Sequence, residues 1–327
     1  MSNYLKKFSG SINLEKMRPF SFYDDNKNIS DNHVKYVLAG EGFVNQYECP
    51  VCKSKEREEF VTKSTIVYQT CLNCESVYPE LFPKNPSDVY GGEKYVDEFN
   101  QIDEKSETYK KTRFGKERLQ ILKNIFGNLE NKKLLDVGCG TGWFLSMCKE
   151  EGMKCYGQEL GKELSAFTEQ RVGVKIFNEH IENIRGHDDY FDVIVLFDLL
   201  EHLIDPVSFV NSLKTKLKPA GVILIFTPHT NSFGIQFLKE HSNLLIPTDH
   251  LCLFSKKTII KLSELIDMKL EELSFNGIDM GDYFSYLEKT GYVIDHQVKQ
   301  KIYNDLQPIL DQHEYANHLR FILKKQT

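Results

Sequence analysis

Short apolar runs alternate with stretches of mixed polarity from residue 132 onward. Five runs have the length of a buried strand: KLLDVG (133–138), KCYGQEL (154–160), VKIFN (174–178), FDVIVLFD (191–198) and GVILIFTP (221–228). Helical patterns lie between them at 142–151, 162–171 and 206–217. Buried strands that alternate with helices predict a parallel sheet with both faces covered. Ligands bind such sheets beyond the carboxyl ends of the strands.

The rest of the chain adds smaller parts to this sheet. A helix near 256–267 and an apolar segment at 269–275 extend the layer. We expect an α/β fold with a doubly wound, Rossmann-like, mostly parallel sheet, a small N-terminal four-cysteine lobe and a helical C-terminus. The expected parts are an N-terminal extension (1–45), the lobe (46–85), the ligand-binding domain (86–294) and a C-terminal helical segment (295–327).

Charge and composition narrow the class of partner. The 327 residues carry a formal charge of −6, whereas proteins that grip a nucleic-acid backbone are usually basic, at least locally. Nucleic acid is therefore not the expected partner. No stretch reaches the ~18 apolar residues of a membrane span, and the N-terminus lacks the apolar core of a signal peptide. We expect a cytoplasmic protein whose cysteines stay reduced.

A glycine-rich turn follows the first strand. The segment LLDVGCGTGWF (134–144) has glycines at 138, 140 and 142, but the dinucleotide fingerprint needs its third glycine where Trp143 stands. Asp136 precedes these glycines by two residues. A bare helix N-terminus favours a pyrophosphate, whereas nearby acids favour a cationic ligand. The turn therefore suits a nucleoside without phosphates.

An acid also ends the second strand. Glu159 lies 21 residues after Gly138, a spacing at which a carboxylate reaches ribose hydroxyls through its two accepting oxygens. Together with FDVIVLFDLLEHLIDP (191–206), these motifs resemble the class I S-adenosylmethionine-dependent methyltransferases. The resemblance covers roughly residues 90–290. It points to the branch whose fourth strand ends in LEHL-DP and whose fifth strand runs into TP-(H/N).

The resemblance implies a set of cofactor contacts. Asp136 would orient the glycine loop and the methionine ammonium, and Glu159 would hold the ribose, with Leu160 against the adenine. The other implied contacts are Gly138, Cys139 and Gly140 under the cofactor, Glu179, His180 and Ile181 beside the adenine, and Phe197 and Asp198 beside the methionine part. Most relatives have a glycine–aspartate pair where this chain has Asn178–Glu179.

A charged segment upstream of the glycine turn resembles the part of the family that closes over the cofactor. Tyr90, Tyr95 and Arg113 lie in it and could contact the cofactor carboxylate or the acceptor. Arg113 has a planar fork suited to a carboxylate. The alternative is a solvated helix face, because lysine and glutamate surround these residues.

Four of the eight cysteines form two C-x-x-C pairs, CPVC (49–52) and CLNC (71–74), with 18 residues between them. This spacing matches a four-thiolate zinc site. Four protein ligands close the coordination sphere, so Cys49, Cys52, Cys71 and Cys74 predict a structural zinc ion. Disulfides and a redox pair are the alternatives. A zinc lobe before such a domain resembles methyltransferases of deoxysugars and surface polysaccharides.

Three histidines stand where an acceptor should bind. Methyl transfer to a hydroxyl or an acidic carbon needs a base, and histidine suits this role near neutral pH. His229 follows the fifth strand and His250 lies in IPTDHLCLFS; both are candidate catalytic bases, and Asp249 could orient either one. His202, in LLEHL, is a further candidate or a structural residue that holds its loop.

These observations favour an S-adenosylmethionine-dependent methyltransferase that acts on a small molecule. A sugar or nucleotide-linked sugar in polysaccharide or secondary-metabolite biosynthesis is the favoured acceptor. The alternatives are an RNA methyltransferase that holds RNA with its zinc lobe, and a non-catalytic cofactor-binding protein of the same fold. The negative charge disfavours RNA, as does FTPHTN after the fifth strand in place of an N-P-P-Y-like segment. The acceptor atom and the oligomeric state stay open.

Overall fold

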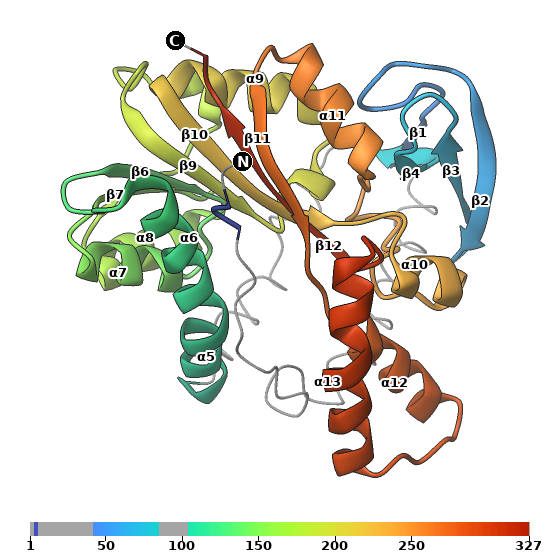
Figure 1. Cartoon of the computed structure of the whole chain (residues 1–327). Helices are drawn as coiled ribbons and strands as arrows, with labels where there is room; N and C mark the ends of the chain where they lie inside the picture. The colour runs from blue at the N-terminus through green and yellow to red at the C-terminus, as the bar shows by residue number, and fades with distance from the viewer. Residues whose placement is uncertain (1–2, 6–41, 85–103, 327) are drawn as a thin grey trace.

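The central sheet has seven strands in the order β11-β12-β10-β9-β6-β7-β8 (Figure 1). The structure, a computed structural model, describes residues 3–5, 42–84 and 104–326. The strands are β6 Lys133–Val137, β7 Lys154–Gln158, β8 Lys175–Phe177, β9 Phe191–Phe197, β10 Leu217–Pro228, β11 Lys269–Phe275 and β12 His318–Lys324. β12 is antiparallel to β10 and β11, whereas β8, β7, β6, β9 and β10 pair in parallel. The predicted doubly wound, mostly parallel sheet is confirmed.

Helices cover both faces of this sheet, and its strands bury side chains on both sides. On β9, Val193 and Val195 belong to one core, and Ile194 and Leu196 belong to the other. This two-sided burial explains why the inner strands are continuous apolar runs. The first face is covered by α6 Lys116–Phe126, α7 Trp143–Glu150 and α8 Lys162–Val172, and the second by α9 Pro206–Lys216 and α11 Lys256–Leu265 (Figure 1).

The C-terminus is only partly helical. The predicted helical segment is present as α13 (His296–Gln312), but the chain then continues as β12, which inserts between β10 and β11. Leu319 and Phe321 of β12 enter one core and Ile322 enters the other. A sequence pattern of helix length could not separate α13 from this strand, because a short apolar run is compatible with either element.

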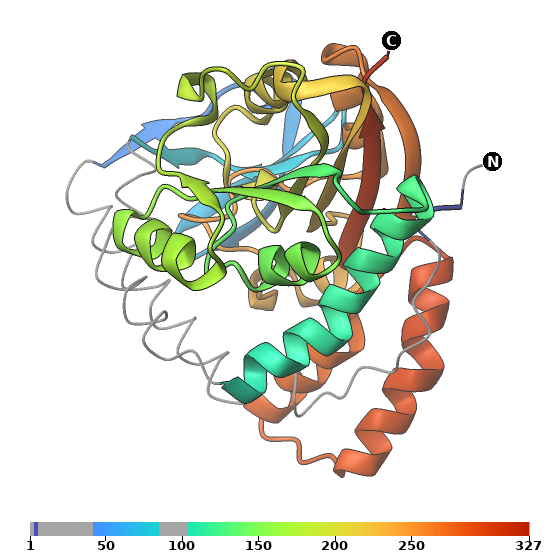
Figure 2. The same cartoon turned by 90° about the vertical axis from the view of Figure 1, so that its left-hand side faces the viewer.

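Helical elements also surround the carboxyl edge of the sheet. α5 (Glu104–Lys110), a π-helical turn (Lys111–Gly115) and α6 form one continuous rod, while α12 (Asp279–Lys289) lies beside α13 (Figure 2). The short helices are α10 Phe233–Leu238 and the 3-10 turns Ile181–Asn183, Leu200–His202 and Lys239–His241. Within the described residues, none of the helices combines the length and the apolar character needed to span a bilayer.

The four-cysteine lobe is a small antiparallel unit packed against the main domain. Its strands are β2 Arg57–Lys63, β3 Ile66–Cys71, β4 Val77–Pro79 and β5 Leu81–Pro83, and β1 Phe43–Asn45 joins them from just before the expected boundary at residue 46. The order β2-β3-β4 forms one sheet, and β1 pairs with β5. Val77 also forms a bridge to Leu253, so the backbone of the lobe is hydrogen-bonded to that of the main domain.

Candidate active site

The glycine turn adopts a backbone conformation that requires glycine. Gly138, Gly140 and Gly142 have φ values of +68°, +52° and +71°, a region that residues with a Cβ rarely adopt. A Cβ on Gly142 would also lie 2.6 Å from the Thr168 side chain. The turn therefore brings its backbone close to α8 and begins α7 directly after β6. This is the carboxyl edge of the sheet, where the sequence predicted a ligand.

Glu159 closes the glycine turn from the neighbouring strand. Its two carboxylate oxygens accept hydrogen bonds from the Gly140 N–H (3.1 Å) and the Gly161 N–H (2.8 Å). Burial raises the pKa of Glu159, and these backbone donors act in the opposite direction. A carboxylate has about four lone-pair positions, so Glu159 can accept further hydrogen bonds from the hydroxyls of a ligand.

Asp136 lies under the turn and is almost fully buried, with 4% of its surface exposed. Burial raises the pKa of Asp136 to about 7, while the positive charge of Arg118 lowers it and the charge of Glu159 raises it further. A buried carboxyl of this kind gains strongly from a cationic partner. The site thus favours a ligand that brings positive charge to this edge.

The remaining residues predicted to border the cofactor differ in their exposure. Cys139 is buried, and its burial raises the pKa of the thiol. Leu160 is half-exposed, Glu179 and His180 are exposed, and Ile181 is fully buried in the core. The Asn178 side chain donates to the carbonyls of Glu159 and Leu160, so it shapes the end of β7.

The two arginines of the upstream helical rod have different surroundings. Arg113 is buried and forms an ion pair with Glu117 at 3.1 Å; Glu117 also pairs with Arg320. Arg118 instead lies over Phe197, with its guanidinium carbon 3.8 Å from the ring centroid. Because Phe197 ends the fourth strand beside the predicted cofactor site, Arg118 is a candidate site residue that the sequence patterns did not mark. Tyr90 and Tyr95 lie outside the described residues.

Arg118 connects the rod to the end of the fourth parallel strand. Its terminal nitrogen is 3.8 Å from the carboxylate of Asp198, and its Nε has no hydrogen-bond partner among the described residues. Burial lowers the pKa of Arg118, and the charges of Asp198 and Asp136 raise it. A buried guanidinium with an unsatisfied donor is suited to an anionic ligand group.

The two predicted catalytic bases are buried in this structure. His229 is 2% exposed, its Nδ1 is 3.0 Å from the Ala316 carbonyl, and burial lowers its pKa to about 4. His250 has its Nδ1 2.7 Å from the Leu244 carbonyl; burial, and then the neighbouring His202, lowers its pKa to about 4. In this conformation neither ring presents an open face to an acceptor, so a base role for either stays a prediction.

His202 and His250 lie together with Glu201 beside the fourth strand. The two imidazole centroids are 4.9 Å apart, and His202 Nε2 is 3.9 Å from a carboxylate oxygen of Glu201. Nδ1 of His202 faces the carbonyl of Asp249, and Nδ1 of His250 faces the carbonyl of Leu244. Because a carbonyl only accepts, each Nδ1 can carry the ring hydrogen, which leaves a lone pair on each Nε2. One ring nitrogen of each histidine and one carboxylate oxygen of Glu201 lie within 4.8 Å of one another, a separation that a metal ion could bridge. The backbone carbonyl of Asp249 faces His202 and not His229 or His250, so the predicted role of Asp249 in orienting either candidate base stays a prediction.

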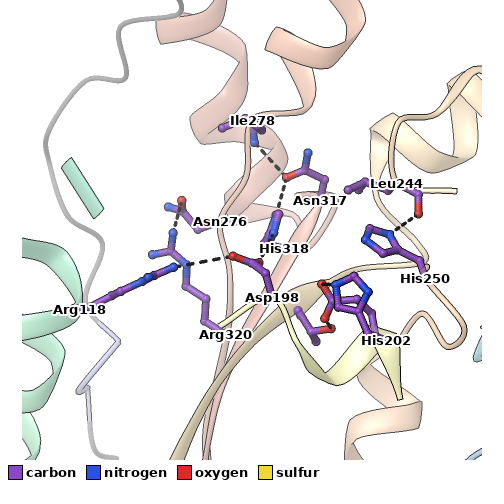
Figure 3. A network of polar contacts seen from close by, with 12 residues as sticks. Arg118, Asp198, His202, Leu244, His250, Asn276, Ile278, Asn317, His318 and Arg320 are labelled. Carbon is purple, nitrogen blue, oxygen red and sulfur yellow. Dashed lines mark hydrogen bonds and ion pairs between the residues drawn. The ribbon is translucent and has the colours of Figure 1, made fainter. Parts of the chain in front are cut away.

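A further histidine reaches the same edge from β12. His318 Nε2 is 3.1 Å from a carboxylate oxygen of Asp198, and its Nδ1 is 3.2 Å from the side-chain oxygen of Asn317 (Figure 3). Desolvation opposes ionisation of Asp198, although its side chain is half-exposed, and the hydrogen bond from His318 and the charge of Arg118 hold the pKa of Asp198 well below its usual range. No motif marked His318, because its partner is 120 residues away in sequence.

The four lobe cysteines converge as the spacing predicted. Cys49 Sγ lies 3.5 Å from Cys74 Sγ, Cys52 Sγ lies 3.5 Å from Cys71 Sγ, and all four sulfurs lie within 4.8 Å of one another. None of them forms a disulfide. Zn–S bonds of about 2.3 Å in a tetrahedron place sulfurs about 3.8 Å apart, so the donor set fits zinc.

The amino-acid sequence of the chain matches a known protein family. The methyltransferase-domain family matches residues 107–273, half of the chain. The ubiquinone biosynthesis O-methyltransferase of Yersinia pestis (strain Pestoides F) is 31% identical over 155 residues, which are 46% of this chain and 64% of that relative. The chain thus spans less than two thirds of the length of that relative.

Solved structures resemble the chain more distantly. Phosphoethanolamine N-methyltransferase 2 of Haemonchus contortus, in complex with S-adenosyl-L-methionine, is 16% identical, with a TM-score of 0.49 over 77% of this chain and 63% of that one. A SAM-dependent methyltransferase of Archaeoglobus fulgidus is 19% identical, with a TM-score of 0.43 over 67% of this chain and 98% of that one.

Proposed function

The chain belongs to the methyltransferase-domain family, and on that premise we propose that it transfers a methyl group from S-adenosylmethionine to a small-molecule acceptor. The observation that carries this proposal is the left-handed glycine turn closed by Glu159 at the carboxyl end of β6. When bound, S-adenosylmethionine supplies a methyl group on a positively charged sulfur. Asp136, Glu159 and Asp198 bring three carboxyl groups to this edge of the sheet, and such groups favour a cationic ligand.

The residues present fit each part of this cofactor. Glu159 would accept hydrogen bonds from the ribose hydroxyls, and Asp136 would face the methionine ammonium. Arg118 would bind the methionine carboxylate, because its Nε is buried without a partner among the described residues. The Nε of Arg113 likewise donates no hydrogen bond within the described residues, but we assign the role to Arg118 because the guanidinium of Arg113 already pairs with the buried Glu117 at 3.1 Å.

A sugar or nucleotide-linked sugar is the acceptor class that we propose. Its support is the combination of a four-cysteine lobe with the methyltransferase domain, which resembles enzymes of deoxysugar and polysaccharide pathways. This support comes from the arrangement of domains and not from a contact with an acceptor. The formal charge of −6 disfavours RNA as the acceptor.

We further propose that the lobe of residues 46–85 binds one structural zinc ion through its four cysteines, ahead of a cofactor-binding domain of residues 86–294. Four thiolates leave no open coordination position, so the ion would stabilise the lobe and take no part in methyl transfer. The sulfur separations of 3.5 Å support this proposal.

A screen with methyl-labelled S-adenosylmethionine tests the acceptor class. The full chain is incubated with separate pools of nucleotide sugars, small phenols and amines, RNA and protein, and the label in each product is counted. Label in the nucleotide-sugar pool is the expected result. Label confined to RNA or protein contradicts a small-molecule acceptor, and label confined to phenols or amines contradicts the sugar. Absence of label from every pool, with cofactor binding intact, indicates a non-catalytic binding protein.

A further inference from the structure

Glu201, His202 and His250 bring three side chains that commonly ligate metal ions together beside the end of β9. Glu201 and His202 lie in the 3-10 turn that follows β9, and His250 lies in the loop before α11. The two segments are joined directly, since the Leu251 and Cys252 N–H groups donate to the carbonyl of Glu201 at 2.7 and 3.0 Å. The rings of His202 and His250 therefore lie next to each other, with their centroids 4.9 Å apart (Figure 3).

The three ligand atoms have separations close to those that one metal ion spans. Nε2 of His202 lies 3.9 Å from Oε1 of Glu201, and one ring nitrogen of each histidine lies within 4.8 Å of the other and of the carboxylate. Two metal–ligand bonds of about 2.1 Å each span at most about 4.2 Å. The cluster therefore needs only a small contraction to bind an ion.

Each of these side chains is already oriented through the atom that a metal ion does not need. Nδ1 of His202 and Nδ1 of His250 face backbone carbonyls at 2.9 and 2.7 Å, and the Thr227 hydroxyl donates to Oε2 of Glu201 at 2.9 Å. A histidine that binds a metal commonly donates its other ring N–H to such a carbonyl, and a ligating carboxylate is itself hydrogen-bonded. The ligand set is therefore Nε2 of each histidine and Oε1 of Glu201.

The charge of this cluster also favours a cation. Glu201 is 1% exposed, and Asp198 adds a second carboxyl group nearby. Within the described residues no lysine or arginine forms an ion pair with Glu201, whose printed ionic neighbour is His202. A buried carboxylate is stable when it is paired with a positive charge or coordinates a metal. A divalent ion between the three side chains would supply that charge.

The four-cysteine lobe holds the segment that carries His250. Tyr68 and Val77 of the lobe share an apolar cluster with Leu244 and Leu253, on either side of His250 in the chain. Val77 and Leu253 also exchange backbone hydrogen bonds at 3.1 and 2.8 Å. The lobe thereby fixes the position of the third ligand, and a metal site is most selective when its ligands are held in place.

We propose that Glu201, His202 and His250 bind one divalent first-row metal ion, in addition to the zinc ion proposed for the lobe. Two imidazole nitrogens and one carboxylate oxygen suit Zn²⁺ or Fe²⁺, whereas Mg²⁺ and Ca²⁺ prefer oxygen ligands alone. Three protein ligands leave a coordination position open, unlike four thiolates. The His202 side chain is 16% exposed, so a small ligand can approach the ion from its side. An acceptor oxygen would take this position, a role that rests on the proposed function.

The zinc content of the full chain tests this site. Each protein is dialysed against excess zinc and desalted, and the bound zinc is counted by mass spectrometry. We expect His202→Gln and His250→Gln to hold one zinc ion fewer per chain than the wild type. His241→Gln is the matched control, because His241 also lies beside a glutamate, with its Nε2 3.7 Å from Glu240, but belongs to no cluster of three ligands within the described residues. Equal zinc content in all four proteins overturns the inference.

Cobalt absorption of the wild-type chain gives a second measurement that needs no variant. One equivalent of zinc first fills the thiolate site, since soft thiolates select zinc. Co²⁺ added next is expected to show the bands of nitrogen and oxygen ligands without charge transfer from thiolate. Thiolate charge transfer alone, or no bound cobalt, contradicts the site.

The acceptor role has its own readout. With the acceptor that the screen identifies, His202→Gln should lower kcat while S-adenosylhomocysteine still binds, and His241→Gln should keep the wild-type rate. An unchanged kcat in His202→Gln contradicts the acceptor role. Failure of the proposed function has a different signature, because then the wild type binds its metal ions but transfers no methyl group to any pool.

Discussion

The hydroxyl of Ser255 donates to the carbonyl oxygen of Cys74 at 3.1 Å, which joins the four-cysteine lobe to the first turn of α11. Thr258 donates to the same carbonyl at 2.7 Å. Ser255 is also the N-cap of α11, so one side chain ends the cysteine turn and begins a helix that covers the sheet. The geometry of the cysteine turn is thereby coupled to the packing of the main domain.

Loss of the metal should therefore destabilise more than the lobe. We expect Cys74→Ser to lower the free energy of unfolding by about 3 kcal/mol or more, because metal binding contributes directly to folding. Thermal unfolding with and without a chelator measures the effect, and hydrogen exchange at residues 253–258 should rise with it. The control is Cys155→Ser, whose thiol lies outside the cluster. Equal stabilities for the two variants would contradict a structural metal.

Arg118 and Arg113 offer a direct test of how the cofactor carboxylate is held. Arg118→Met should weaken S-adenosylhomocysteine binding by roughly 10- to 100-fold, the loss expected for hydrogen bonds to a charged group. Arg113→Met should instead lower stability, since it leaves Glu117 with Arg320 as its remaining buried partner. Calorimetric titration and chemical unfolding of both variants separate the two effects. The reverse pattern would assign the carboxylate to Arg113.

Asp136 should make stability depend on pH. Burial raises its pKa to about 7 in the folded chain, against an ordinary value of 3.8. Between these values the folded chain holds a proton that the unfolded chain has lost, so the free energy of unfolding falls as pH rises from about 4 to about 7. Asp136→Asn should therefore be more stable than the wild type at pH 8, by at most about 4 kcal/mol.

Urea unfolding of the ligand-free chain at several pH values checks this prediction. The advantage of Asp136→Asn should shrink as the pH is lowered and vanish near pH 4. If the free energy of unfolding changed with pH in the same way for the wild type and Asp136→Asn, the carboxyl of Asp136 would not be protonated in the folded chain.

The glycine turn should tolerate no side chain at its third glycine. Gly142→Ala places a Cβ 2.6 Å from Thr168 and 2.8 Å from Val172, in a residue with φ +71°. Gly173 is also left-handed (φ 65°, ψ 45°), and a Cβ there would meet the flexible end of Lys149 at 3.2 Å, so Gly173→Ala isolates the backbone cost of about 1–2 kcal/mol. We expect Gly142→Ala to cost more in urea unfolding and to weaken cofactor binding. Equal costs and unchanged binding would mean that the turn adapts without consequence.

The sequence predicted the parts of the site that local patterns encode. The glycine spacing, the acid at the end of β7 and the paired cysteines are short motifs, and each lies where its spacing placed it. The parts it missed are tertiary. Arg118 is one of several basic residues on a helix, and only packing places it over Phe197. His318 meets Asp198 because β12 inserts between β10 and β11, a crossover that no local pattern records.

The predicted bases illustrate the same limit. His229 and His250 do follow strand and loop ends as the sequence suggested, but whether such a ring faces solvent depends on neighbours far along the chain. The carbonyl of Ala316, just before β12, faces Nδ1 of His229, and the carbonyl of Leu244 faces Nδ1 of His250. Burial of these two rings could not be inferred from spacing alone.

Binding of S-adenosylhomocysteine, measured by calorimetry on the full chain, tests the central claim most directly. The comparison is between wild type, Glu159→Gln and Glu163→Gln, the last an exposed glutamate on α8 that serves as control. We predict micromolar binding by the wild type and the control, and binding at least about tenfold weaker in Glu159→Gln, because a charged acceptor for the ribose is lost. Absence of binding by the wild type, or equal affinity in all three proteins, would contradict a cofactor site at the glycine turn.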